Sequence, residues 1–395
     1  MPKSLNILYH HRTQGRGAEG VHIMSIANAL EALGHKVTIV SPPGIDPRTS
    51  AGNAPVDKSE VTTTGVNSIW KFISKNIPNF MFELIEMAYN IPSMRALERE
   101  LSSQKYDLIY ERYAFYMISG AIKAKKYKIP LILEANEVSG IENRARKQTF
   151  KRVCSWFEGF LFRRCVSIHT VSSHLKAMIL KQGIEDERVL VTPNAIDLEK
   201  FAGKHSAKDL KKQLNIVDQT VIGFAGWFDE WDRLDLLVDV FARLKSKHKN
   251  ILLLLIGDGE VLDTVRQKTA HYELEDNVIM TGAVARSEVQ KYLSILDMAV
   301  FTHSNDFGSP VVMFEFMGLK IPIVAPKLSP ITDVLVDERH ALLFDVLDMQ
   351  MLENKLDRLI GAPEEQCKLA DLAFDLLMSK HTWKNNAESI VRGIN

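Results

Sequence analysis

A run of turn-forming and polar residues ahead of an apolar helix is the first candidate for chemistry in this chain of 395 residues. Residues 304–310 (SNDFGSP) lead into that helix with Pro310 near its first position, so the amides there can face an anion. Glu315 lies one and a half turns into the helix among apolar residues. A carboxylate in such surroundings needs a partner, and either a ribose diol or a structural salt bridge would provide one.

Three other segments have the composition of ligand-binding loops, and each follows an expected strand. Residues 226–233 (GWFDEWDR) contain Arg233, a cation suited to a diphosphate, and two tryptophans that would roof a cleft. Residues 282–284 (GAV) can offer backbone groups to a nucleobase, and residues 256–259 (IGDG) are typical of a tight strand-to-helix turn. Because loops after parallel strands meet at one sheet edge, four of them together favour a site for a nucleotide diphosphate.

Residues 15–20 (GRGAEG) match the G-x-G-x-x-G fingerprint of dinucleotide-binding proteins. Two features argue against NAD binding. Five residues separate Tyr9, the expected strand end, from Gly15, and the second strand ends at residues 40–42 (VSP) without a carboxylate for a ribose. The small residues still allow backbone amides and a helix dipole to approach an anion.

Parallel sheets are needed to position these loops, and the apolar pattern predicts two. Residues 5–11, 19–33 and 36–40 form a β-α-β unit in which Gly34 supplies the helix stop. Further strands are expected at 107–110, 131–134 and 167–171, with a helix near 116–127. After a lysine-rich stretch at 199–219, strands are expected at 221–225, 251–256, 278–281, 298–302, 321–325 and 342–344. The sequence therefore predicts an α/β protein with two doubly wound domains and a boundary near 197–215, and a last helix, 381–395, that must dock on one of them.

Composition excludes several classes of protein. Charged residues make up 25% of the chain, and 21 Gly and 14 Pro are too few for a disordered or fibrous protein. The 49 Lys and Arg balance 49 Asp and Glu, which argues against a dedicated nucleic-acid binder. Three widely spaced cysteines fit a reducing compartment, and no His, Asp or Glu cluster has metal-ligand spacing, so no metal is expected. Residues 1–199 carry 26 basic against 20 acidic residues. Either this excess attracts an anionic partner, or it is ordinary variation between the halves of a chain.

The order and spacing of these motifs resemble the retaining glycosyltransferases of the GT-B fold, specifically glycosyltransferase family 4. The likeness covers nearly the whole chain. It rests on residues 17–19 (GAE), 34–37 (GHKV), 171–172 (VS), 191–197 (VTPNAID), 256–259 (IGDG), 281–284 (TGAV), 308–317 and 321–325 (IPIVA). The resemblance implies two Rossmann-like domains facing a cleft, 1–197 with a crossing helix at 380–395, and 198–379.

The resemblance also implies the chemistry. It implies a UDP- or GDP-sugar donor held mainly by the second domain, a glycan or polyprenyl-phosphate-linked acceptor held mainly by the first, and no metal or other cofactor. It implies front-face attack, in which the leaving phosphate takes the acceptor's proton and no protein nucleophile takes part. The residues expected to bind the donor are Gly17, Gly226, Trp227, Val284, Gly308, Ser309, Pro310, Val311 and Glu315. Those expected on the acceptor side are Arg16, Glu19, Glu111, Arg112, Glu134 and Asn136, and those expected to act in catalysis are Arg233, Arg112 and Glu315.

Glu315 matches the second glutamate of the family's E-x7-E signature, which holds the ribose, but the first glutamate falls at Phe307. Backbone groups of Gly308 and Ser309 would then replace its contact with the sugar. The histidine often found after the fourth strand of the family falls at Arg112, which would orient the donor or the acceptor.

The arginine and lysine of the family's phosphate loop fall at Trp227 and Asp232. Arg233 is the nearest replacement for them, and Arg16 is a second. Because these positions differ, two alternatives stay open: a non-catalytic nucleotide-binding scaffold on the same fold, and a GT-B relative with other chemistry, such as a sugar epimerase or phosphorylase.

Two segments of the first domain have the composition of helices that lie on anionic bilayers. Residues 142–164 hold seven basic and five aromatic residues against Glu142 and Glu158, and residues 69–89 add further aromatic residues with Lys71 and Lys75. No stretch approaches the ~20 apolar residues of a membrane span, and the start lacks a signal-peptide pattern. We therefore expect a cytoplasmic protein that associates peripherally with the inner face of the membrane, unless these helices simply pack on the sheet with a solvated basic face.

Overall fold

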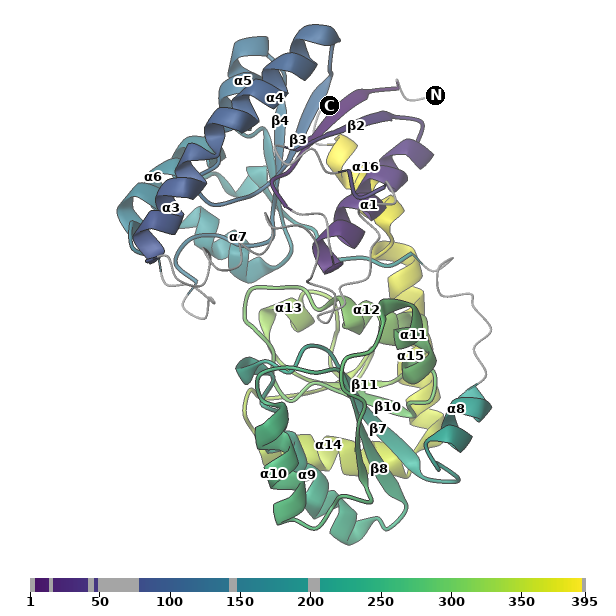
Figure 1. The fold of residues 1–395 in the computed structure, drawn as a ribbon. Coiled ribbons are helices and arrows are strands. Elements are labelled where there is room, and N and C mark those ends of the chain that lie inside the picture. Colours follow the sequence, from purple (N-terminus) through teal and green to yellow (C-terminus); the bar gives the residue numbers. More distant parts are fainter. Residues whose placement is uncertain are drawn as a thin grey trace. The chain divides into compact units, whose positions relative to one another are not determined.

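The structure is a computed structural model that describes residues 4–13, 17–41, 46–48, 78–141, 148–197 and 207–392. The chain divides into two compact units (Figure 1). Unit 1 comprises Met1–Thr192 and Trp383–Asn395, and unit 2 comprises Pro193–Thr382. The chain thus changes unit twice, after Thr192 and again after Thr382.

Unit 1 is built on six parallel strands in the order β2-β1-β3-β4-β5-β6. The strands are β1 (Asn6–His10), β2 (Lys36–Val40), β3 (Leu108–Arg112), β4 (Leu131–Ala135), β5 (Ser167–Thr170) and β6 (Val189–Val191). The helices are α1 (Gly17–Ala32), α3 (Asn79–Ala88), α4 (Asn90–Ser103), α5 (Ser119–Tyr127), α6 (Lys151–Phe162), α7 (Ser173–Leu180) and α16 (Trp383–Arg392). Every residue of β4 is buried, as expected for a parallel strand covered by helices on both faces.

Unit 2 repeats this architecture with six parallel strands in the order β12-β11-β10-β7-β8-β9. The strands are β7 (Thr220–Ala225), β8 (Ile251–Ile256), β9 (Val278–Met280), β10 (Met298–Val300), β11 (Ile323–Pro326) and β12 (Leu342–Phe344). The helices are α8 (Ala207–Gln213), α9 (Leu234–Lys247), α10 (Leu262–His271), α11 (Arg286–Leu293), α12 (Val311–Gly318), α13 (Ser329–Thr332), α14 (Met349–Ile360) and α15 (Pro363–Lys380). Strands β7 and β8 are paired on both sides and are buried almost along their whole length.

Each strand expected from the sequence is present, which confirms the two doubly wound sheets. The sequence did not predict β6, a short strand whose Leu190 and Val191 are exposed. The helix expected near 116–127 begins later, at Ser119, because Tyr116 has a φ of +60° and the Ile118 amide donates to the side chain of Asn90. A residue with positive φ cannot belong to a right-handed helix.

The last helix, α16, packs against α1 in unit 1 (Figure 1). Its apolar stripe of Trp383, Ala387 and Ile390 is buried, and the Trp383 ring meets His22 edge to face, with ring centroids 4.7 Å apart. This confirms that the end of the chain returns to the first domain. Among the described residues, no helix combines the length and the apolar character that crossing a bilayer requires.

Candidate functional site

Hydrogen bonds join the loops that follow β7, β8 and β9 at the carboxyl edge of the sheet in unit 2. The Phe228 amide donates to the Asp258 carbonyl at 2.9 Å, and the Gly257 amide donates to Thr281 Oγ1 at 3.1 Å. Gly257 has a φ of +135°, and a Cβ there would lie 1.9 Å from the carbonyl oxygen of Gly226. Only glycine fits at this close approach of the two loops. The tight turn that the sequence predicts at this point is confirmed.

The loop after β10 joins the same edge through hydrogen bonds of its own. His303 Nδ1 lies 2.9 Å from the carbonyl oxygen of Trp231, and the Gly308 amide donates to Asn305 Oδ1 at 2.5 Å. Ser309 accepts two hydrogen bonds from Asn194, one at its Oγ and one at its carbonyl oxygen. The Gly308 amide and the Ser309 carbonyl, which the sequence offers to a sugar, therefore shape the loop in this structure.

Glu315 is buried in α12, which begins at Val311 with Pro310 as its N-cap. Its Oε1 accepts from Arg286, the first residue of α11, so the helix is tied to the loop after β9. Of the two partners that the sequence left open, the structure contains the ion pair. Its Oε2 is buried and has no hydrogen-bond partner in the part of the chain that the structure describes. Burial raises the pKa of Glu315, and Arg286 opposes that rise.

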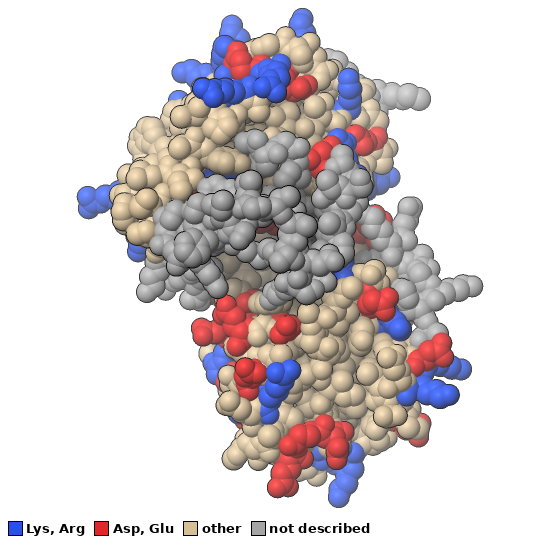
Figure 2. Space-filling view, viewed as in Figure 1, with Lys and Arg blue, Asp and Glu red and all other residues tan. Residues whose placement is uncertain are grey.

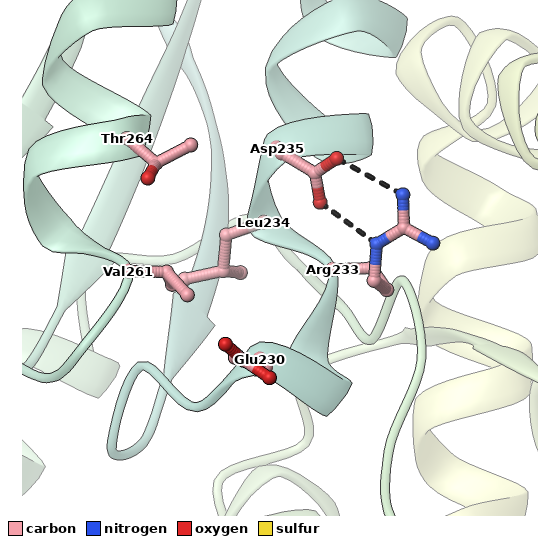
Figure 3. A pocket seen from close by; sticks show the side chains of 6 residues that line it. All are labelled: Glu230, Arg233, Leu234, Asp235, Val261 and Thr264. Carbon is pink, nitrogen blue, oxygen red and sulfur yellow. Dashed lines mark hydrogen bonds and ion pairs between the residues drawn. The ribbon is translucent and has the colours of Figure 1, made fainter.

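Arg233 lies beside a pocket of about 320 Å³ at the same edge (Figure 3). The pocket is lined by Glu230, Arg233, Leu234, Asp235, Val261 and Thr264. Arg233 has a φ of +49° just before α9, and its guanidinium makes two hydrogen bonds to the Asp235 carboxylate, at 2.9 and 3.0 Å. Figure 3 shows the guanidinium turned toward Asp235. An anion that binds Arg233 must therefore compete with this carboxylate.

The other residues expected to bind the donor occupy this edge in different ways. Gly226 is exposed directly after β7, and Trp227 beside it is 43% exposed. Val284 is half-buried and packs against the core of unit 2. Gly17, which was also expected to bind the donor, does not belong to this edge and begins α1 in unit 1.

In unit 1, Glu134 at the end of β4 is the centre of a buried polar network. It accepts from the hydroxyls of Tyr9 and Tyr110, at 2.9 and 3.0 Å, and from the side chains of Arg112 and Asn136. Burial raises the pKa of Glu134, but His22, Arg112 and the hydrogen-bond donors outweigh that effect and lower the pKa to about 2. The side chain of Arg112 is only 11% exposed, so this carboxylate holds a nearly buried cation in place.

Sequence reasoning missed His22, whose Nδ1 lies 3.3 Å from Glu134 Oε1 and 3.2 Å from Arg112 Nη1. Burial lowers the pKa of His22 to about 4, so it is neutral at pH 7. The sequence did contain a signal for His22. It lies one helical turn after Glu19, which was expected on the acceptor side, so both residues share one face of α1. Glu19 itself is exposed in the first turn of α1, and Arg16 lies outside the described residues.

The prediction that Glu111 faces the acceptor is wrong. Its side chain is fully buried, with Oε2 2.5 Å from His10 Nδ1 and Gly120 packed against it. Successive residues of a strand point to opposite faces, so Arg112 and Glu111 cannot both line one site. Among the described residues, no group of His, Cys, Asp and Glu could hold a metal ion.

Models of two protein families match this chain. Residues 19–200 match Glycosyltransferase Family 4, and residues 206–373 match Glycosyl transferases group 1. Together they cover most of both units. The chain belongs to the GT-B glycosyltransferases of family 4.

Curated relatives of this chain are themselves named as glycosyltransferases. Escherichia coli UDP-Gal:alpha-D-GlcNAc-diphosphoundecaprenol alpha-1,3-galactosyltransferase is 20% identical over 322 residues, which span 75% of this chain and 82% of that enzyme. The putative teichuronic acid biosynthesis glycosyltransferase TuaC of Bacillus subtilis is 23% identical over 393 residues, which span 94% of this chain and 92% of that protein.

Solved structures share its fold over nearly the whole chain. The crystal structure of Anabaena HepE in complex with UDP has a TM-score of 0.70 and 15% identity, covering 98% of this chain and 99% of that one. A glycosyltransferase from Rickettsia africae has a TM-score of 0.75 and 12% identity, covering 99% and 98%. These likenesses confirm the GT-B fold expected from the sequence.

The loop after β7, where the resemblance places the family's phosphate loop, contains an unusual carboxyl group. Asp232, which stands where the resemblance places the family's lysine, is 7% exposed in the short helix η4 (Glu230–Asp232). It forms a capping box with Asp229, whose amide donates to Asp232 Oδ2 at 3.1 Å. Burial raises the pKa of Asp232 to about 7, and the neighbouring Asp229 carboxylate adds to the rise.

We expect the substitution Asp232→Asn to remove a pH dependence of stability. An unfolded aspartate loses its proton near pH 4, whereas the folded chain keeps this one up to about pH 7. Between these values the folded state binds more protons, so the free energy of unfolding of the wild type falls as pH rises. About 2 kcal/mol is lost between pH 5.5 and pH 8. Urea unfolding at both pH values, with exposed Asp306→Asn as the control, measures this loss. Equal slopes for wild type and Asp232→Asn would contradict the prediction.

Proposed function

We propose that this glycosyltransferase transfers a hexose-type sugar, with retention of anomeric configuration, from a UDP- or GDP-sugar to a glycan or lipid-linked acceptor in surface polysaccharide synthesis. The main support for the proposal is the buried Glu315, which lies beside loops that hydrogen bonds hold together at one edge of the sheet. Its Oε2, which has no partner among the described residues, is an acceptor suited to a ribose hydroxyl.

The donor would be held by groups that stabilise a departing diphosphate. The first amides of α12, at Val311 and Val312, carry the partial positive charge of a helix N-terminus. Arg233 would exchange Asp235 for a phosphate, since a guanidinium binds either anion through two hydrogen bonds. Trp227, at 43% exposure, offers a flat apolar surface to the donor.

In the proposed reaction, the bond between the sugar and the diphosphate breaks first and the sugar acquires positive charge. The acceptor hydroxyl attacks the same face, and its proton goes to the leaving phosphate oxygen. No protein nucleophile takes part, so the chain acts mainly by electrostatic stabilisation of the leaving group. The reaction as proposed uses no metal ion. On the acceptor side, Arg112 held by Glu134 would orient an anionic or hydroxyl-rich group, with Glu19 and Asn136 beside it.

The relatives support the proposed class of donor and acceptor. The E. coli relative is named for a UDP-galactose donor and a diphosphoundecaprenol-linked acceptor, and the B. subtilis relative for teichuronic acid synthesis. The HepE structure was determined with UDP.

A thermal-shift screen with UDP, GDP, their sugars and NAD tests the donor class. The sugar that stabilises the chain is then incubated with lipid-linked and free glycan acceptors, and the anomeric configuration of the product is read by NMR. Stabilisation by one nucleotide class and an α-product from an α-donor are expected. Stabilisation by NAD alone, or an inverted product, would refute the proposal. Binding without transfer or hydrolysis of any donor would instead favour the non-catalytic scaffold.

A further inference from the structure

Helices α3 and α6 of unit 1 present an apolar surface to solvent. Five large apolar side chains on them are each 40–57% exposed: Phe80, Met81, Leu84, Val153 and Trp156. On α6, the Trp156 ring contacts the rings of Phe157 and Phe160, with centroids 5.3 and 5.8 Å apart. An exposed patch of this kind on one face of a soluble domain indicates an interaction site.

The two helices are fastened together, so their exposed side chains form one surface. Glu83 of α3 accepts from the amides of Thr149 and Phe150, which directly precede α6. It also accepts from the hydroxyl of Tyr116, whose ring packs on Phe157 of α6. We call the exposed side chains of α3 and α6 the α3–α6 surface.

On these helices the acidic side chains are buried or half-buried, whereas exposed charged side chains are basic. The acidic residues Glu83 and Glu158 are buried, and Glu158 accepts from the Tyr113 hydroxyl and the Ser139 amide. The remaining acid, Glu86, is half-buried in an ion pair with Arg12. No exposed carboxylate therefore lies on the described residues of either helix.

Basic side chains, by contrast, surround the apolar residues of α6. Lys151 and Arg152 are exposed at its start, and Arg163 is exposed just after its end. The guanidinium of Arg164 lies over the Phe160 ring, 3.4 Å from its centroid. In Figure 2, the margin of unit 1 where α3 and α6 lie in Figure 1 is tan with blue side chains beside it, and no red is visible there.

We propose that the α3–α6 surface docks on an anionic lipid bilayer. Aromatic and aliphatic side chains would enter the interface between headgroups and acyl chains, while the arginines and lysines meet lipid phosphates. The charge complementarity favours a bilayer over a second copy of the chain, because two copies would bring like charges together. Docking would bring the enzyme to a lipid-linked acceptor at the membrane. Only this biological purpose rests on the proposed function; the docking itself does not.

Vesicle co-sedimentation of the full chain, without donor or acceptor, tests the docking separately from catalysis. The probes are vesicles of phosphatidylcholine alone and with 30% phosphatidylglycerol. Each basic residue near such a surface contributes about fivefold to binding, so Lys151→Gln/Arg152→Gln should weaken binding about 25-fold. Trp156→Ser/Leu84→Ser should weaken it at least tenfold. The wild type should bind the anionic vesicles more tightly and lose that binding at high salt.

Matched controls come from exposed residues elsewhere. Lys125→Gln/Lys128→Gln removes two exposed basic residues at the end of α5, and Val217→Ser removes an exposed apolar residue of unit 2. Both should bind vesicles like the wild type. Equal binding to neutral and anionic vesicles, or unchanged binding of the surface variants, would overturn the proposal. So would a concentration-dependent dimer that Trp156→Ser abolishes while no vesicle binding is found.

Discussion

Substituting Glu315 by glutamine is expected to lower kcat/KM for sugar transfer about 30- to 150-fold, which corresponds to about 2–3 kcal/mol. Glutamine keeps the shape of the side chain but not its charge, and a hydrogen bond from a donor hydroxyl to a carboxylate is stronger than one to an amide. The variant should fold normally, because the remaining partner, Arg286, is 57% exposed and can be solvated by water.

Arg286 provides the matched comparison for Glu315. Arg286→Gln should cost less activity, since it removes only the group that holds Glu315 Oε1. Because burial raises the pKa of Glu315 while Arg286 lowers it, donor affinity should fall as pH drops through the raised pKa. In Arg286→Gln, this loss of affinity should begin at a higher pH. Initial rates from pH 4.5 to pH 8 measure both effects. A Glu315→Gln variant with wild-type kcat/KM would show that this carboxylate has no contact with the donor.

Substituting Glu134 by glutamine is expected to lower the free energy of unfolding by about 3–5 kcal/mol. The amide still accepts hydrogen bonds from Tyr9 and Tyr110, but Arg112 is left as an unpaired cation with an 11% exposed side chain. An uncompensated buried charge is among the largest single causes of destabilisation.

A double-mutant cycle separates the charge from the rest of the network. Arg112→Met/Glu134→Gln should recover most of the lost stability, because neither charge then remains buried. Urea unfolding of the four proteins gives the coupling free energy, with Arg152→Met as the control for an exposed arginine. A cost below about 1 kcal/mol for Glu134→Gln would mean that Arg112 is not held as a buried ion pair.

Local patterns were sufficient to predict the elements that carry the candidate site. Strands β7, β8 and β10 are apolar runs that end in glycine-rich or polar loops, and the start of α12 follows from the turn residues before Val311. The apolar stripe of α16 predicted that it docks, and α16 packs on α1. These predictions succeed because burial of alternate or helically spaced side chains depends on neighbours in the sequence.

Which side chains meet could not be predicted in the same way. Nothing near Glu315 in the sequence indicates Arg286, which lies 29 residues away and reaches it only because both follow strands that end at the same sheet edge. Arg233 was expected to be available to a phosphate, yet Asp235 in the first turn of α9 is its partner. Such pairings depend on distances through space.

Two parallel sheets, the loops at their edges and the resemblance to family 4 follow from the order of the amino acids alone, because each depends on short-range pattern and order. The direction and the partner of each charged group depend instead on how the chain folds in three dimensions. Adjacent residues Glu111 and Arg112 show why: the pleat turns one carboxylate into the core against His10 and the neighbouring cation toward Glu134. A charge acquires its role from the side of the sheet that it faces and from the groups that the fold brings against it.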